Sequence, residues 1–449
     1  MRKFFLVIVF FSLIISFGKV WAAEQLAVSC LASDVNYAIS LANDGDTVII
    51  PPGGTSTLCV WGSNTATVDI NKKITLKGNG TSSTIITVGS GAAIYISSSN
   101  SKVQNFKMVT NENTASNATF IAISGGAEQW VISGMVLDQT IKKLGYVIDL
   151  TSPRPNATNT YGVISGNVIM FDGEQVNYRG PCNSWTTPHS IGGAENLFVE
   201  GNTFIKRSGG SVGYWDSNAN ARTVWRFNTM QGVYFDAHGS WSNYDACSPD
   251  THASARHSEV YNNLWDGEVA WTSIYIRGGT GLIYNNLIKN TTYGSIFLDE
   301  YYVRSGKLNS PNWPYYPNAC ACKPDYPVWF QVGRGLGQGA EPMFIWNNKK
   351  DGADVVISNN PYGGPSTECK NYCNDQTLSV ADFIQFDREV YLRPPQSGDY
   401  LYPYVPYPCP HPLTGLTGSC DFKISGTDGY NIVTSDITPP AAPRNLTII

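Results

Sequence analysis

The chain of 449 residues has 35 acidic and 30 basic side chains, a formal net charge of −5 that is small for this length. Only 14% of the residues are charged and the basic ones do not cluster, which argues against nucleic acid or an anionic membrane as a partner. Low charge together with 43 glycines and 25 tyrosines is typical of a long β-solenoid, whose strands are uncharged and whose turns are small and polar.

The first residues have the pattern of a secretory signal peptide. A basic residue, Arg2, precedes an apolar run that starts at Phe4, and small residues end the segment at Ala23. Residues 1–23 are therefore expected to be removed, and no later stretch has the 18 or so apolar residues of a membrane span. We predict a secreted monomer, located in the periplasm, at the cell surface or outside the cell.

An even number of cysteines in an exported chain indicates disulfide bonds. Cys30 with Cys59 and Cys182 with Cys247 are plausible local pairs, whereas the sequence leaves the connectivity open. A metal site is disfavoured because no histidine lies at ligand spacing beside the closely spaced cysteines. The ten cysteines are Cys30, Cys59, Cys182, Cys247, Cys320, Cys322, Cys369, Cys373, Cys409 and Cys420.

The mature chain is expected to begin with a helix within residues 24–45. Residues 33–44 place apolar side chains at helical spacing, with Ser33 or Asp34 as the N-cap and Gly45 as the stop. The open end of a solenoid exposes its core and its backbone, so a covering helix is required there.

From residue 46 to 360, short apolar alternations recur like the rungs of a parallel β-solenoid. Asparagine tolerates the left-handed backbone conformation that a turn between rungs needs, and stacked amides can form hydrogen bonds up the column. We therefore predict a ladder of asparagine side chains. The four phrases that show it most clearly, spaced by roughly 20 to 35 residues, end on Asn202, Asn228, Asn263 and Asn286.

A second series of strand-like phrases carries charged residues. Since side chains alternate along a strand, a charge that follows an inward apolar residue points outward. The inward residues are Trp215, Phe235, Ile276 and Leu298. The outward charges expected in one column are Asp216, Asp236, Arg277 and Asp299, extended upstream by Asp149. The aromatic residues that precede them, as a platform for sugar rings, are Tyr214, Tyr234 and Tyr275.

Histidines concentrate next to this column. His238 follows Asp236 by two residues, and the loop after it brings His252, Arg256 and His257. An imidazole beside a carboxylate can act as a general acid or base, and Arg256 could neutralise a substrate acid. The alternative is a loop held to the coil by polar contacts, or an ordinary solvated sheet face with charges paired across rungs. His189, predicted one rung before Asp216, is a weaker candidate.

The remaining segments have no rung pattern. Residues 305–329 predict a long disulfide-tied loop, and residues 361–435, with a short helix expected at 378–386, predict a cover for the end of the coil. Residues 436–449 are rich in proline and alanine and predict a tail.

The chain resembles the secreted bacterial right-handed parallel β-helix repeat proteins of the pectin-lyase-like superfamily. The resemblance rests on the helix followed by GDTVIIPPG and ITLKGNG, on the repeated asparagine phrases, and on the late segments FQVGRGLGQGAEPMFIWNN and PYVPYPCPHPLTG. It implies an all-β fold: a single right-handed parallel β-helix with an N-terminal capping helix and an irregular, disulfide-tied C-terminal segment. The Gly-His-Gly of polygalacturonases and the Arg-x-Pro-x-x-Arg of extracellular pectate lyases are not found, so no family catalytic residue is carried over.

The resemblance and the charged column together predict a carbohydrate-active protein that binds and cleaves an acidic polysaccharide as a lyase does. The alternatives are a non-catalytic glycan-binding surface protein and a glycoside hydrolase. The expected catalytic residues are Asp236, His238, Arg277 and Arg256. The expected substrate-binding residues are Tyr214, Asp216, Tyr234, Tyr275, Asp299 and His189. Acid-rich clefts of the superfamily often hold Ca²⁺ against a uronate, and here the ligands would be Asp216, Asp236 and Asp299; no other cofactor is predicted.

Overall fold

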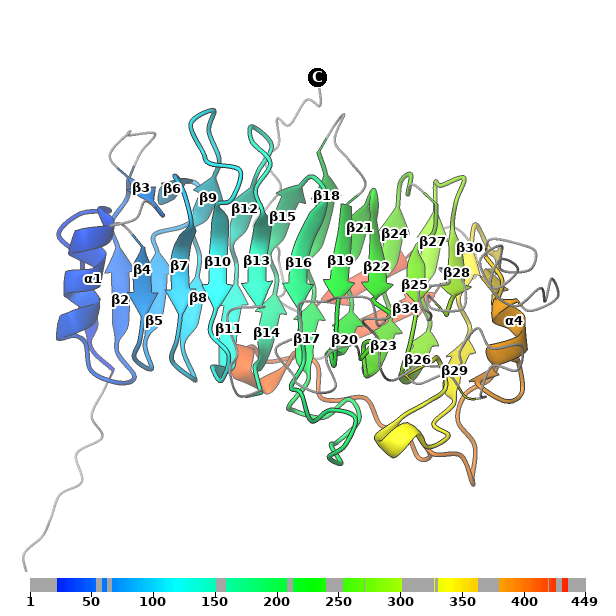
Figure 1. Cartoon of the computed structure of the whole chain (residues 1–449). Coiled ribbons are helices and arrows are strands. Elements are labelled where there is room, and N and C mark those ends of the chain that lie inside the picture. The colour runs from blue at the N-terminus through cyan, green and yellow to red at the C-terminus, as the bar shows by residue number, and fades with distance from the viewer. Residues whose placement is uncertain are drawn as a thin grey trace, which may run out of the picture.

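The chain winds into a parallel β-helix, as the sequence predicts, and each rung gives one strand to each of three sheets (Figure 1). The computed structural model describes residues 22–53, 59–62, 67–150, 159–207, 213–239, 253–269, 271–300, 327, 330–361, 379–418, 420–424 and 430–434. Most of the predicted signal peptide, nearly all of the predicted loop at 305–329 and the predicted tail at 436–449 lie outside these residues. No helix of the described part is long and apolar enough to cross a membrane.

In the described part, the first sheet has 12 strands, the second 11 and the third 10. The first sheet contains β1 (Glu24–Leu26), β2 (Thr47–Ile50), β5 (Thr75–Gly78), β8 (Lys102–Gln104), β11 (Glu128–Ser133), β14 (Tyr161–Ser165), β17 (Leu197–Glu200), β20 (Arg222–Arg226), β23 (His257–Tyr261), β26 (Thr280–Tyr284), β29 (Met343–Trp346) and β33 (Val390–Tyr391). The second sheet contains β3 (Val60–Trp61), β6 (Ile85–Val88), β9 (Lys107–Val109), β12 (Val136–Asp138), β15 (Val168–Phe171), β18 (Thr203–Lys206), β21 (Thr229–Gln231), β24 (Leu264–Asp266), β27 (Leu287–Lys289), β30 (Lys349–Lys350) and β31 (Ala353–Asp354).

The third sheet carries the charged phrases. It contains β4 (Val68–Ile70), β7 (Ala92–Ile96), β10 (Thr119–Ile123), β13 (Tyr146–Leu150), β16 (Glu174–Tyr178), β19 (Gly213–Ser217), β22 (Val233–Ala237), β25 (Ile274–Ile276), β28 (Ser295–Leu298) and β32 (Val356–Ser358). Strand pairing within the three sheets is parallel except between β30 and β31. Parallel pairing starts with β1 and ends with β33, so the coil extends on both sides of the predicted 46–360.

Two helices lie at opposite ends of the coil (Figure 1). Helix α1 (Ala32–Leu41) covers the N-terminal end and buries Val35 and Ile39. Its N-cap is Leu31, so the cap predicted at Ser33 or Asp34 is wrong by two or three residues. At the other end, α4 (Val380–Phe383) is a single turn with a capping box, within the helix predicted at 378–386.

The predicted asparagine ladder is confirmed and is longer than predicted. The backbone N–H and the side-chain amide of each member donate to Oδ1 of the next member, at 2.8–3.2 Å. Its members are Asn167, Asn202, Asn228, Asn263, Asn286 and Asn348. The left-handed residue is not the ladder asparagine but the one before it: Gly166, Gly201, Phe227, Asn262, Asn285 or Asn347. The prediction therefore assigned the left-handed backbone conformation and the ladder hydrogen bonds to one asparagine, whereas two adjacent residues divide these roles.

Large apolar side chains fill the coil under these rungs. Trp225 stacks on Phe204 with ring centroids 4.8 Å apart and meets Trp215 edge-on at 4.7 Å. Each such side chain contributes about 1.5–3 kcal/mol by leaving water. The inward direction predicted for Trp215 and Phe235 is confirmed, since both are buried in the core cluster.

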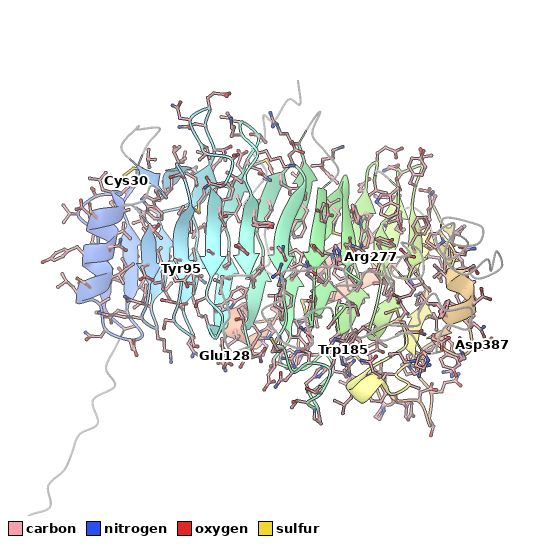
Figure 2. All side chains as sticks on the ribbon, viewed as in Figure 1. Cys30, Tyr95, Glu128, Trp185, Arg277 and Asp387 are labelled. Carbon is pink, nitrogen blue, oxygen red and sulfur yellow. A yellow bond between two sulfur atoms is a disulfide. The ribbon has the colours of Figure 1, made fainter. Side chains whose placement is uncertain are left out.

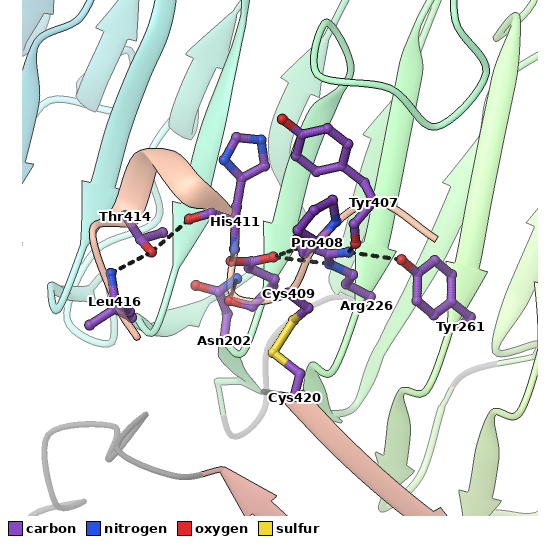
Figure 3. The surroundings of a disulfide bond; sticks show 11 residues. Asn202, Arg226, Tyr261, Tyr407, Pro408, Cys409, His411, Thr414, Leu416 and Cys420 are labelled. Atoms are coloured by element: carbon purple, nitrogen blue, oxygen red, sulfur yellow. Dashed lines mark hydrogen bonds and ion pairs between the residues drawn. A yellow bond between two sulfur atoms is a disulfide. The ribbon is translucent and has the colours of Figure 1, made fainter. Parts of the chain in front are cut away.

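The C-terminal segment packs on the outer face of the first sheet (Figure 3). Arg226 donates to Glu200 at 2.6 Å and to the backbone carbonyls of Tyr407 and Pro408 at 2.6 and 2.7 Å. The segment then turns through η3 (Pro412–Thr414). A disulfide joins its Cys409 to Cys420, the first residue of the hairpin β34 (Cys420–Ile424) and β35 (Tyr430–Thr434).

Two further observations concern the predicted disulfides. The pair Cys30–Cys59 is confirmed and joins the chain before α1 to the residue before β3. Cys182 is also disulfide-bonded, and Cys247, its expected partner, lies outside the described residues.

Another short helix, η2 (Leu336–Gln338), precedes β29.

Candidate active site

The third sheet brings the predicted acids and tyrosines together on adjacent rungs. In the pairing of β19 with β22, Asp216 lies opposite Asp236, and Tyr214 lies opposite Tyr234. The two tyrosine rings stack with centroids 5.4 Å apart and planes inclined by 24°. The predicted neighbours Asp216 and Asp236 and the predicted tyrosine pair are therefore both present.

The predicted column breaks at the next rung, where the register differs by two residues. Asp236 lies opposite Tyr275, and Tyr275 lies opposite Phe297, so Arg277 and Asp299 belong to a neighbouring column. A slip of two residues keeps a side chain on the same face of a sheet, whereas a slip of one would turn it inward. Arg277 therefore still points away from the core, but beside Asp236 and not above it.

Two hydrogen-bonded pairs form where the columns meet. His238 Nδ1 lies 3.0 Å from Asp216 Oδ1. Arg277 donates from Nε to Asp236 Oδ1 at 3.1 Å and from Nη2 to Oδ2 at 2.6 Å. His238 and Arg277 each lie just after their strands, β22 and β25, where the chain turns toward the first sheet. Figure 2 shows Arg277 in the half of the coil nearer to α4.

The cluster is nearly inaccessible although it points out of the coil. Asp216 and Asp236 are 3% exposed and Arg277 is 7% exposed, whereas the His238 side chain is 19% exposed. Burial raises the pKa of Asp216 to about 7, against the positive charges of Arg277 and Arg179. Burial likewise raises the pKa of Asp236, against Arg277.

The imidazole of His238 is shifted in the opposite direction. Burial, reinforced by the positive charge of Arg277, lowers the pKa of His238 to about 3. At neutral pH it is therefore a neutral ring beside a carboxyl group, Asp216, that is half ionised. Environments that shift the pKa values of neighbouring titratable groups in opposite directions in this way are characteristic of acid–base sites.

An aromatic wall borders the cluster. Trp271 meets Tyr234, Tyr275 and Phe297 edge-on, with ring centroids 5.8, 4.8 and 5.7 Å away. The Tyr275 hydroxyl donates to Asp299, and the Arg277 guanidinium lies 4.7 Å from the centre of the Tyr275 ring. Tyr275 is 2% exposed, so it supports Arg277 in this conformation, while Tyr214 is partly exposed.

The residues present do not fit the predicted Ca²⁺ site. Donor atoms of Asp216, Asp236 and His238 lie within 4.8 Å of one another, but Asp299, the third predicted ligand, is not in this group and bonds Tyr275. Calcium takes six to eight oxygen ligands, whereas one donor here is a nitrogen and both Asp236 oxygens already accept from Arg277. The guanidinium is the cation of this site.

Two predicted residues lie elsewhere. Asn177, and not His189, is opposite Asp216 on the preceding rung, so the alignment predicted for His189 is wrong. Arg256 is 1% exposed and donates to Glu341 at 2.6 Å, which directs its guanidinium to the loop before β29. His252 lies outside the described residues.

Sequence reasoning missed several contributors to the site. Arg179, which follows β16, acts electrostatically on Asp216 and His238, and Trp271 forms the aromatic wall. The predicted extension to Asp149 is confirmed, with Asn177 between it and Asp216. Asn177, inside β16, and Arg179, just after it, could have been found by continuing the column one rung upstream, because they have the same two-residue spacing as Asp216, inside β19, and Asn218, just after it.

The comparisons with known proteins add the following. No protein-family model matches the chain, and no curated protein sequence matches it significantly. Among solved structures, it is similar to an alginate lyase from Paenibacillus sp. strain FPU-7, with a TM-score of 0.34 and 12% identity over 75% of this chain and 98% of that one. It is also similar to the PL6 family alginate lyase AlyGC, with a TM-score of 0.28 and 12% identity over 75% of this chain and 50% of that one.

Proposed function

We propose that this chain is an exported protein that cleaves an acidic polysaccharide by β-elimination at the Asp216–His238 and Asp236–Arg277 cluster. The observation that carries the proposal is the hydrogen bond between His238 and Asp216. Asp216 holds its Nδ1, its ring is neutral, and it is the most exposed of the four side chains. A neutral imidazole oriented by a carboxylate is the arrangement of a general base.

The role of Asp216 follows from the tautomer that it selects. When Asp216 is ionised it accepts the Nδ1 proton, so the lone pair of His238 is on Nε2 and can take a proton from the substrate. When Asp216 is protonated it donates to Nδ1, and Nε2 carries the ring proton instead. Asp216 is thus a positioning residue, and His238 is the proposed catalytic base.

Arg277 and Arg179 supply the positive field that elimination from a uronate needs. In that reaction the base removes the proton from the carbon next to the uronate carboxylate. The electron pair of the broken C–H bond forms a carbon–carbon double bond, and the glycosidic oxygen leaves and takes up a proton. Positive charge near the carboxylate stabilises the carbanion-like transition state. Tyr234, whose pKa burial raises, stays protonated and can donate to the leaving oxygen. Tyr214, which is partly exposed, can offer a ring face to the sugars, and the buried Tyr234 stacks behind it.

A second candidate is glycoside hydrolysis, which the neighbouring carboxyl groups favour. Carboxylate oxygens of Asp216 and Asp236 lie within 4.8 Å of each other, which is near enough for the pair of a retaining hydrolase, whose carboxyl groups are ~5 Å apart, and both carboxyl groups have raised pKa values. In that reaction one would act as the acid and the other as the nucleophile.

Product analysis on polyuronates and neutral polysaccharides tests the proposal. Elimination creates an unsaturated end that absorbs in the ultraviolet, and we expect this absorbance to grow with polyuronates and to disappear in His238→Ala. Reducing ends without absorbance would mean hydrolysis and would overturn elimination. Binding without products would mean a glycan-binding surface protein. The disulfides Cys30–Cys59 and Cys409–Cys420 support export, since such bonds persist in oxidising compartments.

A further inference from the structure

The first sheet carries a second buried guanidinium, Arg222, at the start of β20. Arg222 and Arg226 lie on the same outward face of this strand and are 4% and 0% exposed. Arg226 is fully engaged, by Glu200, Tyr261 and two backbone carbonyls. Arg222 instead donates from Nη2 to Asn159 Oδ1 at 2.9 Å, and its buried Nε has no acceptor among the described residues.

No carboxylate of the described residues forms an ion pair with Arg222. A buried guanidinium without a counter-charge costs several kcal/mol relative to a paired one, so proteins pair such groups or bind anions with them. Glu195 lies near it but is exposed and forms no ion pair with it in the described part of the chain. Arg222 therefore provides a positive charge that its own surroundings leave unbalanced.

Arg222 lines a cavity of about 230 Å³ between β20 and the chain before β17. At ~30 Å³ for each water, this volume suits one small polar molecule. Other lining residues are Asn159, Asn183, Ser184 and His189. The Ser184 hydroxyl is buried and has no hydrogen-bond partner within the described residues, and the buried ring of His189 has at most a weak hydrogen bond to the backbone of Thr187.

Buried polar groups are nearly always hydrogen-bonded, so a group of unpaired ones around one cavity indicates that water or a polar ligand occupies it. Two more unpaired atoms belong to residues that act electrostatically on His189, namely Arg256 Nη1 and His257 Nδ1. Burial lowers the pKa of His189 to about 3, and the positive charges of Arg222 and Arg256 act in the same direction.

We propose that this cavity binds a small hydroxylated carboxylate, such as a sugar acid, with Arg222 pairing its carboxylate. A guanidinium presents two N–H groups in the geometry of a carboxylate, and the single unbalanced charge matches a monoanion better than a phosphate. The amides of Asn159 and Asn183 and the Ser184 hydroxyl match the hydroxyl groups of such a ligand. This cavity is on the first sheet, so the proposal does not depend on the cleavage reaction proposed for the third.

Calorimetric titration of the full-length chain with D-galacturonate, D-galactose and inorganic phosphate tests the proposal. The titration is done in the His238→Ala background, so that the proposed active site does not turn over or select the ligand. We expect saturable binding of galacturonate, at least tenfold weaker binding of galactose, and a loss of about 10- to 100-fold in Arg222→Gln. The control is Arg207→Gln, which removes a partly exposed arginine near Asp172 and should leave the affinity unchanged.

Glu195→Gln gives a test of opposite sign. Removing this negative charge from the cavity lining should strengthen galacturonate binding several-fold. Phosphate bound in preference to galacturonate, equal affinity for galactose, or unchanged affinity in Arg222→Gln would overturn the proposal. If Arg222→Gln does not fold, His189→Phe tests the proposal instead, because the phenylalanine ring fills the cavity. Undiminished galacturonate binding in His189→Phe would also overturn the proposal.

Discussion

Two buried ion pairs lie on outward faces of the same coil and differ in how they are completed. Arg226–Glu200 on the first sheet and Arg277–Asp236 on the third both have an N–O distance of 2.6 Å. Around the first pair, backbone carbonyls of the C-terminal segment and the Tyr261 hydroxyl bind the remaining guanidinium N–H groups.

Around the second pair the neighbours are titratable groups. Asp216 and His238 lie beside Arg277–Asp236, and their pKa values are shifted in opposite directions. An ion pair whose remaining N–H groups are bound by backbone carbonyls can only stabilise the fold. An ion pair beside groups that can exchange protons near neutral pH can also do chemistry, and this difference separates a structural arginine from a functional one.

The largest effect is expected from Arg226→Met. This change leaves Glu200 buried without its cation and frees two backbone carbonyls, so the free energy of unfolding should fall by about 3–5 kcal/mol. Cleavage by the folded fraction should be unchanged. Denaturant titration together with activity per folded molecule measures both, and a variant as stable as the parent would show that the C-terminal cover contributes little.

His238→Ala should have the opposite profile. We expect turnover to fall by about 10²–10⁴-fold, the contribution of a general base, with little loss of stability, since this side chain is partly exposed. Tyr95→Ala is the matched control, because Tyr95 (Figure 2) lies on the same sheet, in the column of Asp216 and Asp236 but several rungs away. Equal activity in His238→Ala and Tyr95→Ala would place the site elsewhere.

The asparagine ladder lies at the turns between the first and second sheets, and a change in it should destabilise the rungs that carry both ion pairs. Asn263→Leu removes the acceptor of both amide donors of Asn228 and three side-chain hydrogen bonds of its own. The buried groups left unpaired should cost about 1–3 kcal/mol or more. Thermal unfolding measures this loss, and an unchanged melting temperature would contradict the ladder's contribution to stability.

The pH dependence of cleavage tests the roles proposed for Asp216 and His238. Asp216 ionises near pH 7, and His238 can act as a base only when Asp216 is ionised, so activity should rise about tenfold per pH unit below pH 7 and level off above it. In Asp216→Asn this rise should disappear and activity should stay low at every pH, because the amide donates to Nδ1 and fixes the wrong tautomer. A profile that falls through pH 7 would reverse the proposed roles.

The smallest effect is expected from a chelator. Arg277, and not a metal ion, is the cation bound by Asp236, so EDTA should leave both the cleavage rate and the melting temperature unchanged. Loss of activity restored by Ca²⁺ would show that the originally predicted calcium site forms after all.

The fold could be predicted because its rules are local. Alternation along a strand fixed the inward Trp215 and the outward Asp216, and an asparagine at each corner marked the rungs. The pair Asp216 and Asp236 was predicted correctly because the chain between them is short. Arg277 was placed in the wrong column because 41 residues separate it from Asp236, and loops of that length hide a slip of two residues.

The rest of the site depends on contacts between distant segments. The direction of Arg256 is set by Glu341, 85 residues later, and Arg226 is completed by carbonyls 181 and 182 residues later. The repeat pattern of the sequence does not indicate such distant partners. For the same reason the sequence did not distinguish Arg222 from Arg226, although the charge of Arg222 has no counter-charge in the described residues and the guanidinium of Arg226 is fully hydrogen-bonded.

The ladder has a consequence for how the chain can vary. Asn263 and Asn286 are bonded neighbours 23 residues apart, whereas Asn286 and Asn348 are bonded neighbours 62 residues apart, and the hydrogen bonds are alike. Closing the longer loop costs only roughly 0.9 kcal/mol more chain entropy, by the logarithmic dependence on loop length. Segments inserted between ladder positions are therefore nearly independent of the scaffold's geometry, so loops over either face can be lengthened, exchanged or grafted while the rungs that hold Asp216, Asp236 and Arg277 keep their positions.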